Sequence, residues 1–220
     1  MRPLEGAGGA AFEEDGRLYT ESAAPGTRVY GERVVSRDGA EYREWSPHRS
    51  KLSAYLAAGG RSVPFGRGSE VLYLGASSGT TASHVSDIVS EGRVYCVEFS
   101  PRAFRDLVAA CGPRPNMIPI LGDAMRPSGY GFAVGGADAV YSDVAQKRQA
   151  DIALDNAEAF GAKRGMIAVK ARSEDVTAPP ERVFRETEER IRDRGYRIVD
   201  AVSLEPFEKA HEMIVFEAMR

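Results

Sequence analysis

The sequence is poor in the residues that build disulfide frameworks and metal sites. Its 220 residues include only two cysteines and three histidines. Cys96 and Cys111 lack the close spacing of metal ligands, and Cys96 lies in an apolar stretch. We therefore expect two reduced thiols, no disulfide and no metal site.

Long apolar runs and a charge excess of one sign are also missing. No stretch approaches the roughly 20 apolar residues that span a membrane. The N-terminal sequence MRPLEGAGGAAFEEDG has no signal-peptide core, so we expect an intracellular, cytoplasmic protein without membrane contact. The net charge of −3 argues against a protein that holds nucleic acid by overall positive charge. The segment from Arg43 to Arg67, with several basic residues and a single glutamate, leaves room for a local basic patch.

The first 45 residues differ from the rest of the chain. Short β-rich runs at residues 17–20, 27–30 and 32–35 alternate with glycine-containing turns, which predicts a small N-terminal antiparallel β domain over residues 1–45. A second domain is predicted over residues 46–220. It should open with a helix that has Ser46 as N-cap and Pro47 in its first turn and that ends near Ala58, before Gly59-Gly60.

From residue 70 onward, predicted strands and helices alternate. The strands fall near residues 70–75, 93–98, 117–121, 137–142, 164–171, 196–203 and 211–218, and the helices near 80–90, 101–111, 146–161 and 179–194. Such alternation is typical of an α/β fold with a mostly parallel, doubly wound sheet. Because only residues 205–210 join the last two strands, the last strand should be antiparallel. This seven-stranded order is typical of methyltransferases that use S-adenosyl-L-methionine (SAM), although a fold alone does not establish a function.

A glycine turn follows the first of these strands, in the stretch VLYLGASSGTT at residues 71–81. A strand, a turn bracketed by Gly75 and Gly79, and a helix N-terminus together direct backbone N–H groups at a ligand. The two glycines are four residues apart and do not make the dinucleotide fingerprint GxGxxG. SAM is therefore favoured over NAD, and an NAD-dependent oxidoreductase stays the alternative at this point.

Acidic residues end the next three strands. Glu98 is placed to accept hydrogen bonds from two ribose hydroxyls, and Asp123, in Gly122-Asp123-Ala124, from an adenine amino group. Asp143 opens the segment Asp143-Val144-Ala145-Gln146, where the methionine part of SAM would lie. Either Glu98 or Asp123 alone could be a capping or turn residue. Three acids at successive strand ends beside a glycine turn favour a shared ligand site.

Lysine is scarce, which makes its positions informative. Of the 29 basic residues only five are lysines. Lys170 emerges from a buried strand, and Lys51 lies in the helix that precedes the sheet. A desolvated lysine can release its proton and act as a base, whereas arginine cannot. His211 opens the last strand and is a weaker candidate, because a lone histidine is more often structural.

These motifs resemble the fibrillarin family, and most closely its archaeal RNA 2′-O-methyltransferases. The matching segments include VLYLGASSGTTASHVSD, VYCVEFSPR, ILGDA, VYSDVAQ, VKARS and FEKAHEM. The resemblance implies a catalytic set at Lys51, Asp143, Lys170 and His211. It implies SAM contacts at Thr80, Thr81, Glu98, Phe99, Asp123, Ala124, Asp143 and Gln146, to which the turn and the fourth strand end add Gly75, Gly79, Val144 and Ala145.

The same resemblance implies partners and a setting. It implies a SAM-dependent ribose 2′-O-methyltransferase for rRNA and tRNA, inside a ribonucleoprotein with a box C/D guide RNA, a Nop-domain scaffold protein and a kink-turn-binding ribosomal-type protein. A non-catalytic SAM-binding subunit of the same particle is the alternative. Two positions depart from the family pattern: Ser46, which can still cap a helix, and Glu174, which we interpret as a loop change at the mouth of the site.

Overall fold

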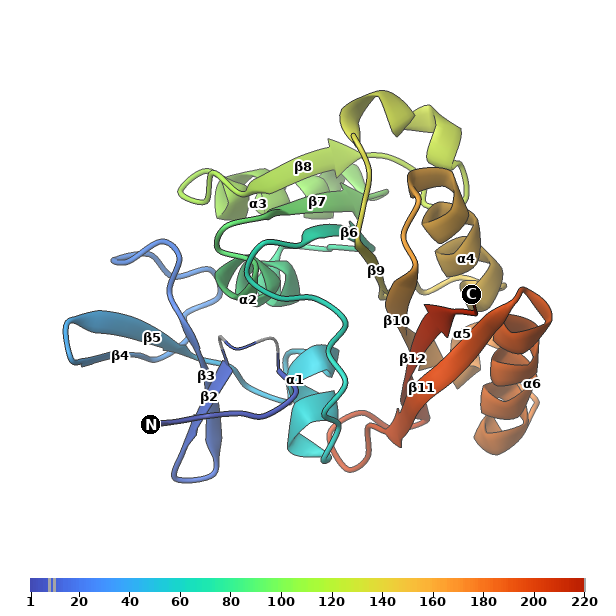
Figure 1. Ribbon diagram of the computed structural model, residues 1–220, viewed down its shortest axis with the longest axis horizontal. Coiled ribbons are helices and arrows are strands. Elements are labelled where there is room, and N and C mark those ends of the chain that lie inside the picture. Colours follow the sequence, from blue (N-terminus) through green and yellow to red (C-terminus); the bar gives the residue numbers. More distant parts are fainter. Residues whose placement is uncertain (8, 10, 220) are drawn as a thin grey trace.

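The computed structural model describes residues 1–7, 9 and 11–219, and in this part of the chain two β-sheets organise the fold (Figure 1). The larger sheet has seven strands in the order β11-β12-β10-β9-β6-β7-β8. Its strands are β6 (Glu70–Leu74), β7 (Arg93–Glu98), β8 (Met117–Leu121), β9 (Ala139–Ser142), β10 (Arg164–Lys170), β11 (Tyr196–Ser203) and β12 (His211–Ala218). β12 runs antiparallel to both its neighbours, and the pairs among β6 to β10 are parallel. The predicted seven-stranded sheet with an antiparallel last strand is confirmed.

Helices cover both faces of this sheet. They are α1 (Lys51–Ala57), α2 (Thr80–Ile88), α3 (Pro101–Cys111), α4 (Gln149–Phe160), α5 (Ala171–Glu174) and α6 (Pro180–Asp193). Along β6, Val71 and Tyr73 pack into the core shared with α1 to α3, while Leu72 and Leu74 pack into the core shared with α4 and α6. The continuous apolar run of this strand is therefore buried on both sides. Within the described residues no helix is long and apolar enough to cross a membrane.

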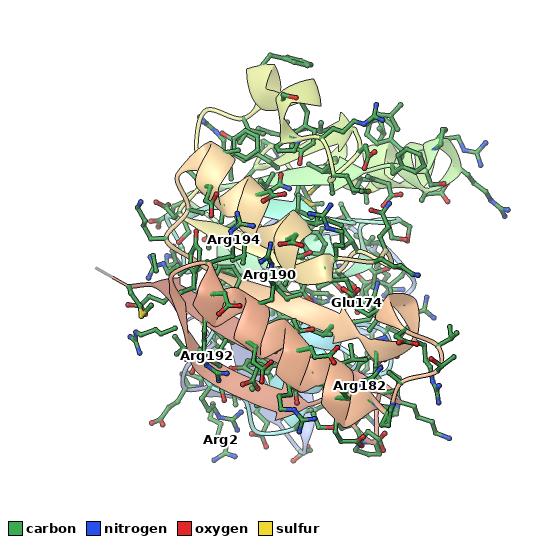
Figure 2. The ribbon with its side chains drawn as sticks, turned by 90° about the vertical axis from the view of Figure 1, so that its right-hand side faces the viewer. Arg2, Glu174, Arg182, Arg190, Arg192 and Arg194 are labelled. Atoms are coloured by element: carbon green, nitrogen blue, oxygen red, sulfur yellow. The ribbon has the colours of Figure 1, made fainter. Side chains whose placement is uncertain are left out.

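Ion pairs hold α6 beside α4 on the second face. Arg190 Nε lies 2.7 Å from Asp151 Oδ1, and Arg194 Nη1 lies 3.3 Å from the same oxygen. Figure 2 shows Arg190 and Arg194 on the side of α6 that faces α4. Burial opposes the charge of Asp151, but the hydrogen bonds from Arg190 and Arg148 prevail and lower its pKa. The two helices therefore form one layer over β9 to β11.

The small sheet has the order β1-β2-β3-β5-β4 and is antiparallel throughout. Its strands are β1 (Arg2–Pro3), β2 (Ala11–Glu14), β3 (Arg17–Glu21), β4 (Val34–Arg37) and β5 (Ala40–Glu44). The strand predicted at residues 27–30 is wrong. There, the backbone N–H groups of Val29 and Tyr30 donate to the Glu32 carboxylate and not to a neighbouring strand.

A buried polar network joins the small sheet to α2. Arg43 on β5 pairs with Glu32 at 2.6 Å and with Asp87 of α2 at 2.7 Å. Asp87 also pairs with Arg114 at 2.6 Å, and all four side chains are almost fully buried. Burial and the two arginines lower the pKa of His84, so this imidazole is neutral. Arg43 is therefore part of the core, and the segment from Arg43 to Arg67 does not form one basic surface.

Helix α1 starts later than predicted, at Lys51. Its N-cap is Ser50, which is extended and whose Oγ accepts a hydrogen bond from the Ser53 N–H. Ser46 lies instead in the preceding turn, where its carbonyl accepts from the Arg49 N–H. The expected cap at Ser46 is wrong because Ser50 satisfies a free N–H of the first helical turn. Lys51 is consequently the first residue of the helix.

Candidate active site

A cavity of about 320 Å³ opens at the carboxyl ends of β6, β7, β8, β9 and β10. Each of these five strands supplies residues from its end or from the loop that follows. The lining residues are Gly75, Ser77, Val97, Glu98, Phe99, Gly122, Ala124, Asp143, Val144, Ala145, Gln146 and Lys170. The structure therefore brings together nine of the predicted site residues, drawn from five separate segments of the chain.

The glycine turn allows two strand ends to approach each other. Gly75 has a φ of +78°, and a Cβ there would lie 2.9 Å from the carbonyl oxygen of Asp143. Gly79 has a φ of +89°, and its Cβ would lie 2.9 Å from Cβ of Ala110 on α3. Any side chain would therefore strain the backbone and separate β6 from the Asp143 loop. Gly75 lines the cavity, whereas Gly79 supports the turn from behind.

Glu98 lies at the end of β7 with its carboxylate half-buried. Its Oε2 accepts from the Ser77 N–H at 2.8 Å, and its Oε1 accepts from the Ser100 N–H at 2.7 Å. The carboxylate thus holds the glycine turn and the loop after β7 in place. Each carboxylate oxygen has a second lone pair, so Glu98 can still accept from ligand hydroxyls. Next to it, Phe99 lines the cavity with 65% of its surface exposed.

The adenine end of the predicted site is formed mainly by Ala124. This residue is buried and lines the cavity, whereas Asp123 does not line it. Asp123 Oδ1 accepts a hydrogen bond from the Met125 N–H at 3.0 Å, as a turn aspartate does. Its assignment to an adenine amino group stays a prediction.

Three side chains meet beside the cavity, which Asp143 and Lys170 line and Lys51 does not. Lys170 Nζ lies 2.8 Å from Asp143 Oδ1, and Lys51 Nζ lies 3.1 Å from the same oxygen. Lys170 Nζ also donates to the backbone carbonyl of Asp143 at 2.7 Å. The three side chains are 14–18% exposed. Residues separated by 92 and 27 positions in the chain thus share one partly desolvated carboxylate.

Two tyrosines lie in the apolar layer beneath this carboxylate. The rings of Tyr73 and Tyr141 are 4.6 Å apart between centroids, and both side chains are buried. Burial raises the pKa of both phenols well above the ordinary value, and the charge of Asp143 adds to the rise. Neither phenol therefore ionises near neutral pH, and the ionisable side chains that meet at this point are those of the two lysines and Asp143.

His211 lies directly opposite Lys170 in the antiparallel pair of β10 and β12. Residues paired in this way project from the same face of the sheet, with Cβ atoms about 5 Å apart. The imidazole Nδ1 lies 2.8 Å from the carbonyl oxygen of Lys209. His211 is therefore a neighbour of Lys170, but it does not line the cavity.

Thr80 and Thr81 begin α2 and stand behind the glycine turn. Thr81 is buried, and its Oγ1 donates to Ser50 Oγ at 3.0 Å. This hydrogen bond ties the start of α2 to the N-cap of α1, the residue before Lys51. The predicted contacts of Thr80 and Thr81 with SAM find no support in the cavity lining.

The residues present fit SAM on two observations. Gln146 Oε1 is buried at the cavity and has no hydrogen-bond partner among the described residues. A buried acceptor of this kind needs a donor, which the ammonium group of a methionine part would provide. The absence of a side chain at Gly75 keeps the floor open, and Glu98 can accept from ribose hydroxyls.

Comparisons with known proteins identify the family of this chain. The model of the family described as Fibrillarin matches residues 9–220. The fibrillarin-like rRNA/tRNA 2′-O-methyltransferase of Methanopyrus kandleri is 51% identical over 212 residues, which cover 94% of this chain and 91% of that protein. Aeropyrum pernix fibrillarin, solved with natively bound S-adenosyl-L-methionine, superposes with a TM-score of 0.83 at 47% identity, covering 91% of this chain and 88% of that one. A chain of a fibrillarin/Nop5p complex superposes with a TM-score of 0.87 at 40% identity, covering 96% of this chain and 98% of that one.

Proposed function

Because the chain belongs to the fibrillarin family, we propose that it is the catalytic subunit of a box C/D guide ribonucleoprotein. Its reaction is SAM-dependent methylation of ribose 2′-hydroxyls in rRNA and tRNA, the activity in the name of its 51% identical relative. The observation that carries the catalytic role is the meeting of Lys51, Asp143 and Lys170 beside the cavity.

Glu98 would hold the ribose of SAM, and Gln146 would hold its methionine part. When bound, SAM supplies an electrophilic methyl group whose carbon–sulfur bond breaks as the oxygen–carbon bond forms, with the bonding electrons leaving on sulfur. The protein holds the acceptor hydroxyl in line with that methyl group and removes its proton. Phe99, half-buried Glu98 and Ala124 line the outer part of the cavity.

Lys170 is the proposed base. To act, its ammonium group first releases one proton to solvent, after which Nζ accepts the proton of the attacking 2′-hydroxyl. Asp143 holds Nζ from two sides, through its carboxylate and its backbone carbonyl. Lys51 shares the Asp143 carboxylate and places a second positive charge near Lys170. His211, opposite Lys170, has the proposed role of orienting the acceptor.

The partners proposed for the particle are a guide RNA, a Nop-domain scaffold protein and a kink-turn-binding protein. A related chain is found in a complex named fibrillarin/Nop5p, which supports the scaffold. The charge of this chain supports delivery of RNA by other components. Its net charge is −3, Arg43 is buried, and Arg67 is paired with Glu91 at 2.7 Å. Few free cations therefore remain in the segment from Arg43 to Arg67 to hold an RNA backbone.

The proposal is tested by comparing the protein alone with the assembled particle. Ribose methylation of a guide-matched RNA is measured by mass spectrometry at equal salt concentration. We expect the isolated protein to bind SAM but to methylate poorly, and the particle to methylate the guided nucleotide. Equal methylation rates for the protein alone and for the particle would indicate a stand-alone methyltransferase. SAM binding without methylation by the complete particle would favour the non-catalytic subunit.

A further inference from the structure

A side-chain amide holds the backbone of Lys170 from the α4 side. Gln149, the first residue of α4, is fully buried. Its Oε1 accepts from the Lys170 N–H at 2.9 Å, and its Nε2 donates to the Lys170 carbonyl at 3.1 Å. Both backbone polar groups of this lysine are therefore bonded to one amide. We call this pair of hydrogen bonds the amide clamp.

The amide clamp takes the place of a missing strand. β9 pairs with β10 only as far as Ile167, opposite Ser142, where β9 ends. Beyond that point the backbone of β10 has no strand partner on the β9 side, although β12 still pairs on the other side up to Lys170. Buried backbone groups without a partner cost free energy. Gln149 removes that cost and fixes the point at which the lysine side chain leaves the sheet.

The amide clamp is itself held by Glu174. Arg148, the residue before α4, has a φ of +65° and provides no side-chain cap. The Glu174 carboxylate caps the helix instead, since it accepts from the Arg148 N–H at 2.8 Å and from the Gln149 N–H at 2.6 Å. Glu174 lies on the short helix α5 that follows Lys170 and is labelled in Figure 2. The interpretation of Glu174 as a loop change at the mouth of the site is therefore wrong.

These contacts form a closed loop around the proposed base. The chain runs from Lys170 through α5 to Glu174, whose carboxylate binds the first residue of α4. That residue is Gln149, and its side chain hydrogen-bonds to the backbone of Lys170. A shift of one part would move the Lys170 backbone and, with it, Nζ. Displacements of about 1 Å at a reacting group can reduce a rate by about 100-fold.

We propose that Gln149 is a positioning residue that sets the location of Lys170 Nζ for methyl transfer, with Glu174 as its support. This inference rests on the proposed function. Gln149 touches neither the cavity nor Asp143 in the described contacts. It therefore acts through Lys170, and its removal should affect the rate of transfer and not the binding of SAM.

The test uses Gln149→Met in the reconstituted particle, because methionine matches the length of glutamine but makes neither hydrogen bond. We expect the single-turnover rate of methyl transfer to fall by about 10-fold to 100-fold, with SAM affinity unchanged within about twofold. The matched control is Asn116→Leu, which removes an amide that donates to the carbonyls of Ser86 and Val89, away from the cavity. That variant should keep the rate even if it lowers stability.

A second measurement separates positioning from general stability. In a Lys170→Ala background, Gln149→Met should cause no further loss of the residual rate, because its target is absent. Glu174→Gln keeps one acceptor and should give a smaller loss in the same direction, so the inference stays testable if Gln149→Met folds poorly. A wild-type rate for Gln149→Met, or an equal loss in both backgrounds, would overturn the positioning role. A Lys170→Ala particle at the wild-type rate would overturn the proposed base, and with it this inference.

Discussion

At the scale of single residues, Asp143 and Glu98 each serve two purposes. Asp143 binds Lys170 through its carboxylate and its carbonyl, while its carboxylate also binds Lys51. Glu98 holds two loops through backbone N–H groups while its remaining lone pairs face the cavity. Substitution of either residue therefore changes both the ligand site and its scaffold, and the experiments must separate the two effects.

Glu98→Ala should weaken SAM binding by about 1.5–3 kcal/mol, the typical loss for hydrogen bonds to a charged group. Isothermal titration calorimetry measures this directly. Ser100→Pro removes the N–H that donates to Oε1 and also the hydroxyl that caps α3 but keeps the carboxylate, and it is the control for the scaffold role. Unchanged SAM affinity in Glu98→Ala would show that the carboxylate only holds the loops.

Glu212 should make the stability depend on pH. Burial, with the nearby charge of Glu188, raises the pKa of Glu212 to about 7. The folded state therefore keeps the proton between the ordinary value of 4.5 and about 7, where the unfolded chain has lost it. The contribution of Glu212 to the free energy of unfolding is therefore fully present below pH 4.5 and is lost as the pH rises to about 7.

The measurement is urea unfolding at pH 5 and pH 8 for the wild type and Glu212→Gln. The variant should gain about 1–2 kcal/mol relative to the wild type at pH 8, a discounted figure because partial solvation screens the carboxylate. Groups shared by both proteins, such as His84, cancel in this difference. The same pH dependence in both proteins would refute the assignment.

At the scale of elements, apolar runs predict most of the strands, and the residues at strand ends predict most of the candidate site. The runs around residues 137–142 and 164–170 predict buried strands, and the structure brings Asp143 and Lys170, at the ends of these runs, within 2.8 Å of each other. The predicted start of α1 at Ser46 is wrong because Ser50, four residues later, supplies the N-cap of the helix. The amide clamp could not be predicted from the sequence, because Gln149 and Lys170 are 21 positions apart and meet only in the folded chain. The burial of Arg43 could not be predicted for the same reason.

Arg43→Met should destabilise the protein by about 3–5 kcal/mol, because it leaves Glu32 as a buried charge without its ion-pair partner. Urea unfolding measures the loss. Arg67→Met is the control: its pair with Glu91 is exposed on both sides, so the free energy of unfolding should hardly change. Equal effects of the two substitutions would mean that the buried network does not hold β5 to α2.

At the scale of the whole molecule, α1 lies between the small sheet and strands β11 and β12 of the large sheet (Figure 1). The small sheet shares a core with α1 and α2, and α1 carries Lys51 while α2 begins at the glycine turn. The site is thus assembled from parts that are far apart in the sequence. The net charge of −3 agrees with the proposed function, in which other components position the RNA.

We propose that Lys170 is the base of a ribose methyl transfer. The test is the single-turnover rate of methylation of a guide-matched RNA by particles containing wild type or Lys170→Arg. Arginine keeps the positive charge beside Asp143 but cannot release a proton. We expect a rate lower by about 10²–10⁴-fold, with SAM affinity largely kept. A Lys170→Arg particle that methylates at a near-normal rate would contradict it and reduce Lys170 to an electrostatic role.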